Sequence, residues 1–197
     1  MDNETVDVYN AQAKKYVDLV SQDKPDRDLK AFMTAVSAGG NLLDLGCGPG
    51  NSASAMMAAG FNVTATDASS EMVKMAKEQF GVPAKQALFS DINEKDVYDG
   101  VWANFSLLHA PRADFPRHLD AIYSALRAKG ILHLGLKLGQ GEMRDKIGRL
   151  YSYYSEAELM EHINNSGLTL ISLRQGSAKG LAGDTEPFII LLAKKNA

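Results

Sequence analysis

Three glycines and two acids stand where a chain could bind a nucleoside-like ligand. Gly46, Gly48 and Gly50 alternate directly after a short apolar run that contains Asp44. Glycines let the backbone approach a ligand closely, and a helix that begins after such a turn presents free N–H groups to it. Asp67 ends a later β-branched run, where a carboxylate can accept hydrogen bonds from both hydroxyls of a ribose. The pattern predicts a site for a ribose-containing cofactor.

The glycine spacing departs from the dinucleotide fingerprint. That fingerprint reads Gly-x-Gly-x-x-Gly, and Asn51 stands where its third glycine would be. The turn reads Asp-x-Gly-x-Gly-x-Gly instead. A dinucleotide-binding oxidoreductase stays an alternative, because it would use Asp67 in the same way. Asp67 also suits a second role, as the cap of a helix that the sequence predicts from Ser69 or Ser70 to Phe80.

These residues need a sheet to position them, and the hydrophobic pattern predicts one. Apolar and β-branched runs predict strands at 41–45, 61–66, 83–89, 98–105, 131–138, 168–173 and 187–193. Helical spacing predicts helices at 52–59, 69–80, 114–126 and 156–165, the last with a capping box from Ser155 and Glu158. Alternating strands and helices favour an α/β fold with a parallel sheet, and the last two strands are expected to form an antiparallel edge.

Composition fits one soluble globular domain. The 197 residues are 45% hydrophobic and 23% charged, which predicts a single domain over 1–197. A net charge of -3 argues against a broad basic surface, so no nucleic-acid partner is expected. A single cysteine, Cys47, excludes an intramolecular disulfide and any Cys-cluster metal site, and no metal is expected. No apolar run approaches membrane-spanning length and the chain begins without a signal-like segment, which predicts a cytoplasmic protein with no membrane partner. The oligomeric state is not readable from the sequence.

Several segments resemble one enzyme family. Asp44-Leu-Gly46-Cys-Gly48-Pro-Gly50 resembles motif I of class I S-adenosylmethionine-dependent methyltransferases, and Asp67-Ala68-Ser69 resembles their ribose-binding acid and its turn. The stretch 98–112 is similar to their motif IV and the loop after it. The resemblance covers nearly the whole chain and is to the small bacterial group that includes tellurite-resistance-type enzymes. It implies a Rossmann-like three-layer α/β sandwich, with a mostly parallel seven-stranded sheet and an antiparallel last strand.

The resemblance also implies S-adenosylmethionine as cofactor, S-adenosylhomocysteine as product and a set of cofactor contacts. The glycines would admit the amino-acid portion, Phe89 and Asp91 the adenine, and residues 104–106 would face the methyl group. Residues 1–40 would form a helical lid. The contacts are expected at Tyr9, Tyr16, Asp44, Gly46, Gly48, Gly50, Asp67, Ala68, Met72, Phe89, Ser90, Asp91, Asn104, Phe105 and Ser106. Alternatives remain: Phe89 and the two tyrosines as packing residues, and Asp91 as a helix cap.

Candidates for catalysis and for acceptor binding come from the second half of the chain. His109 follows motif IV and could act as a base or line the acceptor pocket, the alternative being a loop histidine with no chemical role. Segment 139–154 is expected to form a substrate-side loop. Acceptor contacts are predicted at Lys137, Arg144, Arg149 and Tyr154, against the alternatives of a snorkelling lysine, surface ion pairs and packing. His118 and His162 are predicted at solvated helix positions.

The acceptor class follows mainly by exclusion. Enzymes that methylate the amino groups of nucleic-acid bases carry Pro-Pro after the first residue of motif IV, whereas Asn104 is followed by Phe105-Ser106. The sequence therefore predicts an enzyme of class EC 2.1.1.- that methylates a small molecule by in-line displacement, with O, N, S, C and metalloid acceptors open. A catalytically silent S-adenosylmethionine-binding regulator and an NAD-binding oxidoreductase are the alternatives.

Overall fold

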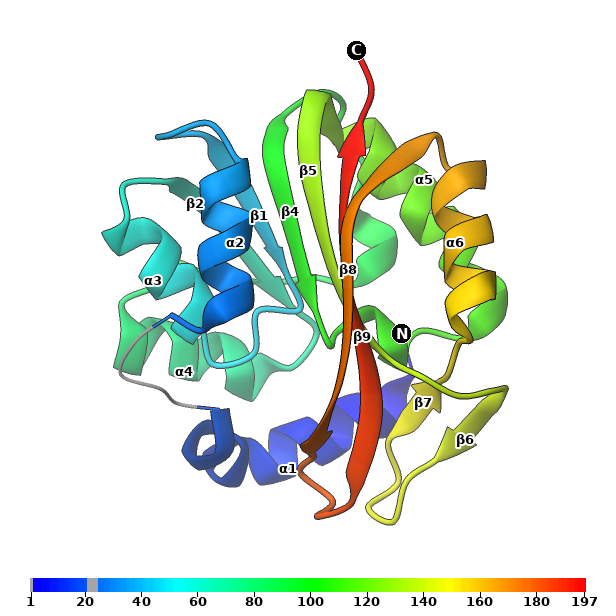
Figure 1. Cartoon of the computed structure of the whole chain (residues 1–197). Helices are drawn as coiled ribbons and strands as arrows, with labels where there is room; N and C mark the ends of the chain where they lie inside the picture. The colour runs from blue at the N-terminus through cyan, green and yellow to red at the C-terminus, as the bar shows by residue number, and fades with distance from the viewer. Residues whose placement is uncertain (1, 21–24) are drawn as a thin grey trace.

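The computed structural model describes residues 2–20 and 25–197, and a seven-stranded sheet lies at its centre (Figure 1). The strand order is β3-β2-β1-β4-β5-β9-β8. Strands β1 to β5 are parallel to one another, while β9 runs antiparallel to both of its neighbours, β5 and β8. The strands are β1 (Asn41–Leu45), β2 (Asn62–Asp67), β3 (Lys85–Gln86), β4 (Tyr98–Asn104), β5 (Leu126–Lys137), β8 (Leu168–Lys179) and β9 (Thr185–Lys195). The predicted Rossmann-like sheet is confirmed.

Helices cover both faces of this sheet, which gives three layers (Figure 1). On one face, Leu43 and Val101 pack with residues of α5 and α6. On the other face, Leu42 packs with Phe32 of α2 and with α3. The helices are α1 (Asn3–Val20), α2 (Arg27–Ala35), α3 (Asn51–Ala58), α4 (Ser70–Phe80), α5 (Phe115–Ala125) and α6 (Glu156–Asn165). Among them, α1 crosses beneath the carboxyl ends of the central strands in Figure 1, and its helical geometry is interrupted at Gln12.

Strand register sets which side chains share the face of α2 and α3. Asp44 of β1 pairs with Trp102 of β4, which pairs with His133 of β5. One step on, Asn104 pairs with Gly135. Side chains alternate between the two faces of a strand, so these residues form two rows on a single face. Both rows lie at the carboxyl ends of the strands, where open α/β sheets bind their ligands.

Several segments differ from the sequence prediction. The third strand, predicted at 83–89, is only Lys85–Gln86, because Phe89–Asp91 forms a 3₁₀ turn in which the Asp91 carboxylate accepts the Leu88 N–H at 2.8 Å. Strands β8 and β9 are longer than predicted and pair along almost their whole length. The stretch predicted as a loop at 139–154 contains an antiparallel hairpin of β6 (Glu142–Arg144) and β7 (Leu150–Ser152).

Within residues 2–20 and 25–197, no helix is both long and apolar enough to cross a membrane. Across the same ranges, no group of three or more His, Cys, Asp or Glu side chains is placed to hold a metal ion.

Candidate functional site

The glycine turn forms the end of β1 and is tied to β2 by its backbone. The amides of Gly46 and Cys47 both donate to the Thr66 carbonyl, at 2.8 and 2.9 Å. Gly46 has a φ of +75°, and a Cβ at this position would lie 2.4 Å from the Cβ of Ser106. The crossing of these two segments therefore requires a residue without a side chain. The predicted close-approach turn is present.

Asp67 fastens the same turn from the end of β2. Its carboxylate accepts from the Gly48 amide and from the Ser69 amide, each at 2.8 Å. Burial raises the pKa of Asp67, and the two hydrogen bonds oppose that rise. The cap of α4 is Ser69, whose hydroxyl accepts the Met72 N–H at 3.1 Å, so helix capping is not the role of Asp67.

A small cavity of about 40 Å³ lies between this turn and α1. Asp67 lies at its wall, and the ring of Phe89, which is buried, contributes an apolar surface. Two tyrosines of α1 close the opposite side with their rings packed edge to face at 5.3 Å. The lining residues are Tyr9, Tyr16, Gly46, Gly48, Asp67, Ala68, Met72, Phe89, Asn104, Phe105, Ser106 and His109.

One carboxyl oxygen of Asp44, beside a second and larger cavity, has no hydrogen-bond partner. The side chain of Asp44 is 2% exposed, it borders this cavity, and the unpartnered oxygen is Oδ2. Burial, and then the neighbouring carboxylate of Asp67, raise the pKa of Asp44 to about 8. A hydrogen bond from the Ala53 amide opposes the rise. A buried carboxyl with one free oxygen is suited to receive a cationic or N–H-bearing ligand group.

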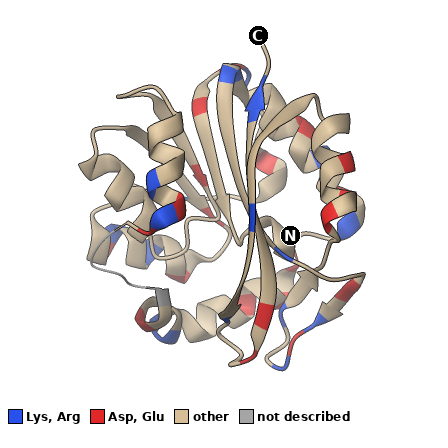
Figure 2. Ribbon diagram, in the orientation of Figure 1, with Lys and Arg blue, Asp and Glu red and all other residues tan. Residues whose placement is uncertain are grey.

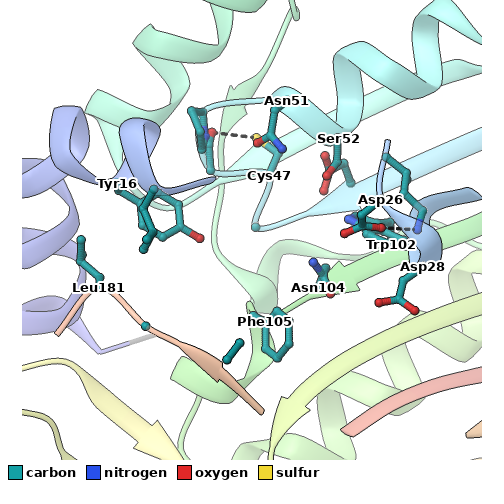
Figure 3. A pocket seen from close by; sticks show the side chains of 18 of the residues that line it. Tyr16, Asp26, Asp28, Cys47, Asn51, Ser52, Trp102, Asn104, Phe105 and Leu181 are labelled. Atoms are coloured by element: carbon teal, nitrogen blue, oxygen red, sulfur yellow. Dashed lines mark hydrogen bonds between the residues drawn. The ribbon is translucent and has the colours of Figure 1, made fainter. Parts of the chain in front are cut away.

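The larger cavity, of about 690 Å³, extends from the glycine turn to the β8–β9 hairpin. Its walls carry two ion pairs: Arg174 with Asp28 of α2, and Lys137 with Glu186 of β9. Lys137 also lies 4.0 Å from the ring centre of Tyr151. In Figure 3, Asn104 and Phe105 lie below the glycine turn at Cys47, and Leu181 lies apart from them at the left of the view. Asn104 and Phe105 border both cavities, as do Tyr9, Tyr16, Gly46 and Gly48, so the two spaces meet between α1, the glycine turn and the end of β4.

His109 is part of a continuous hydrogen-bond chain. Its Nδ1 lies 2.7 Å from the Leu150 carbonyl oxygen, which can only accept, so Nδ1 carries the hydrogen. Nε2 therefore accepts from the Tyr9 hydroxyl at 2.8 Å, and that hydroxyl oxygen accepts from Arg149 at 2.8 Å. Burial lowers the pKa of His109 to about 3. In this arrangement the imidazole is neutral and both nitrogens are occupied.

Some predicted site residues lie away from both cavities. Arg144 is on the surface, where it pairs with Asp2 at 2.8 Å. Tyr154 is fully buried and packs against Phe115, with ring centres 4.7 Å apart. Lys137 and Arg149 border the larger cavity, whereas Arg144 and Tyr154 are outside its lining, and the acceptor roles of these residues stay predictions.

Three predicted cofactor contacts are also absent from the two linings. Gly50 is the N-cap of α3. Ser90 and Asp91 belong to the 3₁₀ turn, and the Asp91 carboxylate is used to close it. The cap alternative for Asp91 is thus the one that the structure shows. His118, predicted to be solvated, is 2% exposed, because it lies on the face of α5 that meets the sheet.

Several lining residues were not found from the sequence. Asp28 and Arg174 are 146 positions apart, and no local pattern links them. Glu186 and Phe188 share one face of β9, and the period-two alternation of that strand was the only available signal. Trp102 lies within the motif IV resemblance but was not singled out.

Charges over the fold are mixed. Figure 2 shows Lys and Arg interspersed with Asp and Glu along the helices, the hairpins and the strand ends. Of the basic residues in the wall of the larger cavity, Lys137, Arg149 and Arg174 face acidic partners, and Lys179 is the fourth. A ligand here meets paired charges and aromatic rings rather than a field of one sign.

Comparison with known proteins identifies the central part of this chain. Residues 42–130 match a family model described as a methyltransferase domain, and this stretch includes the glycine turn, Asp67 and Asn104. A search of curated proteins found no match.

Solved structures with the same fold share little sequence. One is the Burkholderia thailandensis 1,6-didemethyltoxoflavin-N1-methyltransferase, with 1,6-didemethyltoxoflavin and S-adenosylhomocysteine bound. Its sequence is 18% identical to this chain, the TM-score is 0.75, and the match covers 99% of this chain and 88% of that one. A Methanosarcina mazei S-adenosylmethionine-dependent methyltransferase has 16% identity and a TM-score of 0.75, covering 88% and 99%. The [4+2]-cyclase SpnF has 18% identity and a TM-score of 0.71, covering 97% and 94%. These likenesses establish the fold.

Proposed function

We propose that this chain, a class I S-adenosylmethionine-dependent methyltransferase with S-adenosylmethionine as its cofactor, methylates a small molecule bound in the larger cavity. The observation that carries the proposal is the meeting of the two cavities at Asn104 and Phe105. A transferase needs the donor and the acceptor to face each other across one short gap. The end of β4 supplies such a gap, with the glycine turn on one side and the ion-paired aromatic walls on the other.

The residues around the glycine turn fit the parts of the cofactor. The free Oδ2 of Asp44, where the larger cavity borders the glycine turn, suits an ammonium group, and the Asp67 carboxylate in the smaller cavity suits ribose hydroxyls. Phe89 and Met72 offer an apolar wall for a purine ring, and Ala68 lines the same cavity. Ser106 has a buried hydroxyl without a partner at the same cavity. Gly50, Ser90 and Asp91 are left out of this assignment because of their positions.

The chemistry asks little of the protein beyond alignment. The bound cofactor supplies an electrophilic methyl group on a sulfonium. The chain would orient the acceptor at the end of β4 and exclude water, for which Tyr9 and Tyr16 of α1 are positioned. Alignment of reacting groups can contribute on the order of 7 to 11 kcal/mol through effective molarity. Positioning is thus the main catalytic effect in this proposal.

A protein base is not needed in this scheme. His109 is neutral, but its Nε2 already accepts the hydrogen of Tyr9, so it would have to break this bond before accepting another proton. Lys137 and Glu186 neutralise each other. These observations favour an acceptor atom that is a soft nucleophile or is already deprotonated in solution, for which general-base catalysis is unnecessary.

Acceptor shape is suggested by the walls of the larger cavity. The rings of Phe105 and Phe188 meet edge to face at 5.5 Å, and Tyr151 lies beside Lys137. Such walls suit a planar molecule with polar edges. The Burkholderia enzyme of the same fold acts on 1,6-didemethyltoxoflavin, which is consistent with this class but leaves the atom open. Likeness to the tellurite-resistance-type group remains a prediction, so O, N, S, C and metalloid acceptors all stay possible.

The N-terminal segment and the β6–β7 hairpin act together in this proposal. Residues 1–40 of a single 1–197 domain would form the lid, and the hairpin within 139–154 would hold it. The Leu150 amide donates to Thr5 of α1 at 2.8 Å, and Arg149 donates to Tyr9. Entry of the cofactor into a cavity of about 40 Å³ then requires α1 to shift. Residue 1 and residues 21–24 of the proposed lid lie outside the described residues.

Calorimetric titration tests the cofactor assignment. Purified protein is titrated with S-adenosylmethionine, S-adenosylhomocysteine and NAD, alongside Asp67→Asn and, as the matched control, Asp120→Asn at an exposed position of α5. We expect the first two ligands to bind, the Asp67 variant to lose at least about tenfold in affinity because one charge-assisted bond pair is lost, and the control to bind normally. Binding of NAD alone would overturn the proposal.

Acceptor screening tests the second half. Release of S-adenosylhomocysteine is measured with panels of heteroaromatic N–H acids, phenols, thiols and metalloid oxyanions, and with DNA, RNA and a protein lysate as controls. Turnover of members of the small-molecule panels supports the proposal. Turnover confined to the macromolecular controls would contradict it.

A further inference from the structure

Asn104 stands where the two cavities meet, and its amide is held by a histidine that reaches neither of them. Nε2 of His133 lies 3.0 Å from Oδ1 of Asn104. His133 is 1% exposed and is absent from both cavity linings, whereas Asn104 borders both. An amide oxygen can only accept a hydrogen bond, so Nε2 of His133 must carry the hydrogen. The contact therefore fixes a tautomer of the histidine and a rotamer of the asparagine together.

His133 is itself clamped by aromatic rings. Its imidazole stacks on the indole of Trp102, with centres 3.6 Å apart and planes 19° from parallel. Phe32 of α2 lies edge-on, 6.3 Å away. The β4–β5 register places His133 directly beside Trp102, one step from the Asn104–Gly135 pair. A ring held on one flat face and one edge has little freedom to turn its nitrogens.

The backbone around Asn104 is fitted to the same amide. Gly135 lies opposite it, and a Cβ there would lie 2.6 Å from Asn104 Oδ1. The next residue, Phe105, has a φ of +53° and donates its N–H to the Gly135 carbonyl at 3.0 Å. Positive φ in a bulky residue is uncommon and persists where the surroundings impose it. The strand end is therefore shaped to hold the Asn104 side chain in one orientation.

Packing alone does not account for the hydrogen bond between His133 and Asn104. A leucine or phenylalanine would fill the same space without burying two ring nitrogens. The charged groups whose fields reach the ring, Asp28 of α2 and Arg174 of β8, are paired with each other and are not hydrogen-bonded to it. Burial lowers the pKa of His133 to about 3, so the ring is neutral and donates as an N–H rather than as a cation.

We propose that His133 is a positioning residue for methyl transfer, which turns Asn104 so that its amide N–H₂ group faces the junction of the two cavities. The inference rests on the proposed function. With Oδ1 engaged, the group that Asn104 presents is a donor. A donor at this place selects acceptor molecules that carry a lone-pair atom, such as a ring nitrogen, a carbonyl or a carboxylate, beside the atom to be methylated. It then holds the acceptor in line with the methyl group.

Nitrogen NMR of the imidazole tests the contact without any acceptor. In ¹⁵N-labelled protein, with and without S-adenosylhomocysteine, His133 should show a protonated Nε2 and an unprotonated Nδ1 from pH 5 to 9. In Asn104→Asp the pKa of His133 should rise into this range, because a carboxylate stabilises the imidazolium. An Nδ1-protonated ring in the wild type, or His133 signals that are identical in Asn104→Leu, would overturn the proposal.

Kinetics test the consequence, with any acceptor that releases S-adenosylhomocysteine in the screen. His133→Leu should lower kcat roughly tenfold through lost alignment, with the calorimetric Kd for S-adenosylmethionine within twofold of wild type. His133→Gln keeps an N–H donor and should restore kcat to within about threefold. His162→Leu, the same change in α6, is the matched control. A wild-type kcat in His133→Leu would contradict the positioning role. So would an equal loss of kcat in His133→Leu and His133→Gln when both variants are folded. Absence of S-adenosylmethionine binding would instead refute the proposed function, and the tautomer result would stand.

Discussion

The two cavities are built by different means. Around the smaller one, the contacts at the glycine turn involve backbone amides: the Gly48 amide donates to Asp67, 19 positions away, and the amides of Gly46 and Cys47 donate to Thr66. Around the larger one, contacts join side chains that are far apart in sequence, such as Arg174 with Asp28 and Lys137 with Glu186. Both kinds meet at the end of β4.

This difference separates what the fold must keep from what it can vary. The amide donors of the glycine turn, the backbone cradle, are present whatever the side chains are, because every residue except proline carries a backbone N–H. Only a substitution that disturbs the path of the chain can change them. Side-chain pairs can be exchanged without moving a strand, so the larger cavity can change its ligand while the sheet stays the same. The presence of both a methyltransferase and a [4+2]-cyclase among structures of this fold agrees with such a division.

The largest expected effect concerns a side-chain pair that is structural rather than exchangeable. Arg149 is 2% exposed, and its guanidinium binds the Asp145 carboxylate at 2.7 and 3.0 Å. Arg149→Met leaves a carboxylate without its partner in a mostly buried place, so the free energy of unfolding should fall by about 3 to 5 kcal/mol. Urea denaturation measures it.

The control for this prediction lies five residues away. Arg144→Met removes a similar pair with Asp2 at the surface, where water already screens the charges, and should change the unfolding free energy far less. Equal losses in the two variants would show that burial does not distinguish the hairpin pairs.

The next prediction addresses the backbone cradle. Gly46→Ala combines the strain of a side chain at φ +75° with a collision against Ser106. The left-handed backbone alone costs roughly 1 to 2 kcal/mol, and we expect the collision to add about as much again. Affinity for S-adenosylmethionine should therefore fall by about a hundredfold. Gly60→Ala is the matched control: its φ is +90°, and nothing lies within 4 Å of its Cβ. Titration calorimetry should find normal binding in Gly60→Ala. A similar loss in both would mean that strain, and not the crossing at Ser106, governs the turn.

The sequence predicted the parts that depend on local patterns. The capping box of Ser155 and Glu158 is present, with the Glu158 carboxylate accepting the Ser155 amide at 2.8 Å. The strand before the glycine turn followed from its apolar run, and the mostly parallel sheet followed from the alternation of strands and helices. These features involve residues a few positions apart, whose effect on the backbone does not depend on the rest of the fold.

The remainder depended on distant contacts or on a misread residue type. Asp28 with Arg174 cannot be paired without the fold, and neither can the chain of Arg149, Tyr9 and His109. His118 is different, because it follows Phe115 by three positions and precedes Ile122 by four, which places it on the buried face of α5. The spacing of His118 along the helix indicates burial, but a solvated position was predicted because histidine is polar.

A smaller effect should follow from the carboxyl of Asp44. Its pKa is raised from 3.8 to about 8 in the folded protein, so the folded chain keeps a proton that the unfolded chain releases. The free energy of unfolding must therefore fall as pH rises from about 4 to 8. Asp44→Asn lacks this proton, and its stability relative to wild type should increase by at least about 1 kcal/mol between pH 5 and pH 8. Urea denaturation at both pH values checks this, with Asp120→Asn as the control. If the free energy of unfolding depends on pH in the same way in wild type and in Asp44→Asn, the pKa of Asp44 is not raised in the folded protein.

The smallest effect belongs to the exchangeable pair in the larger cavity. Glu186 accepts from Lys137 and from the Tyr153 hydroxyl, the latter at 2.7 Å. Glu186→Gln keeps the shape and leaves the Lys137 charge without its counterion, so acceptors that carry a carboxylate or another anionic group should bind a few fold more tightly. Affinity for S-adenosylmethionine should stay the same, since Glu186 borders only the larger cavity. KM values for matched anionic and neutral acceptors, measured with both proteins, check the prediction. A gain for both kinds of acceptor, or a loss of S-adenosylmethionine binding, would mean that the side-chain half and the backbone half of the site are not independent.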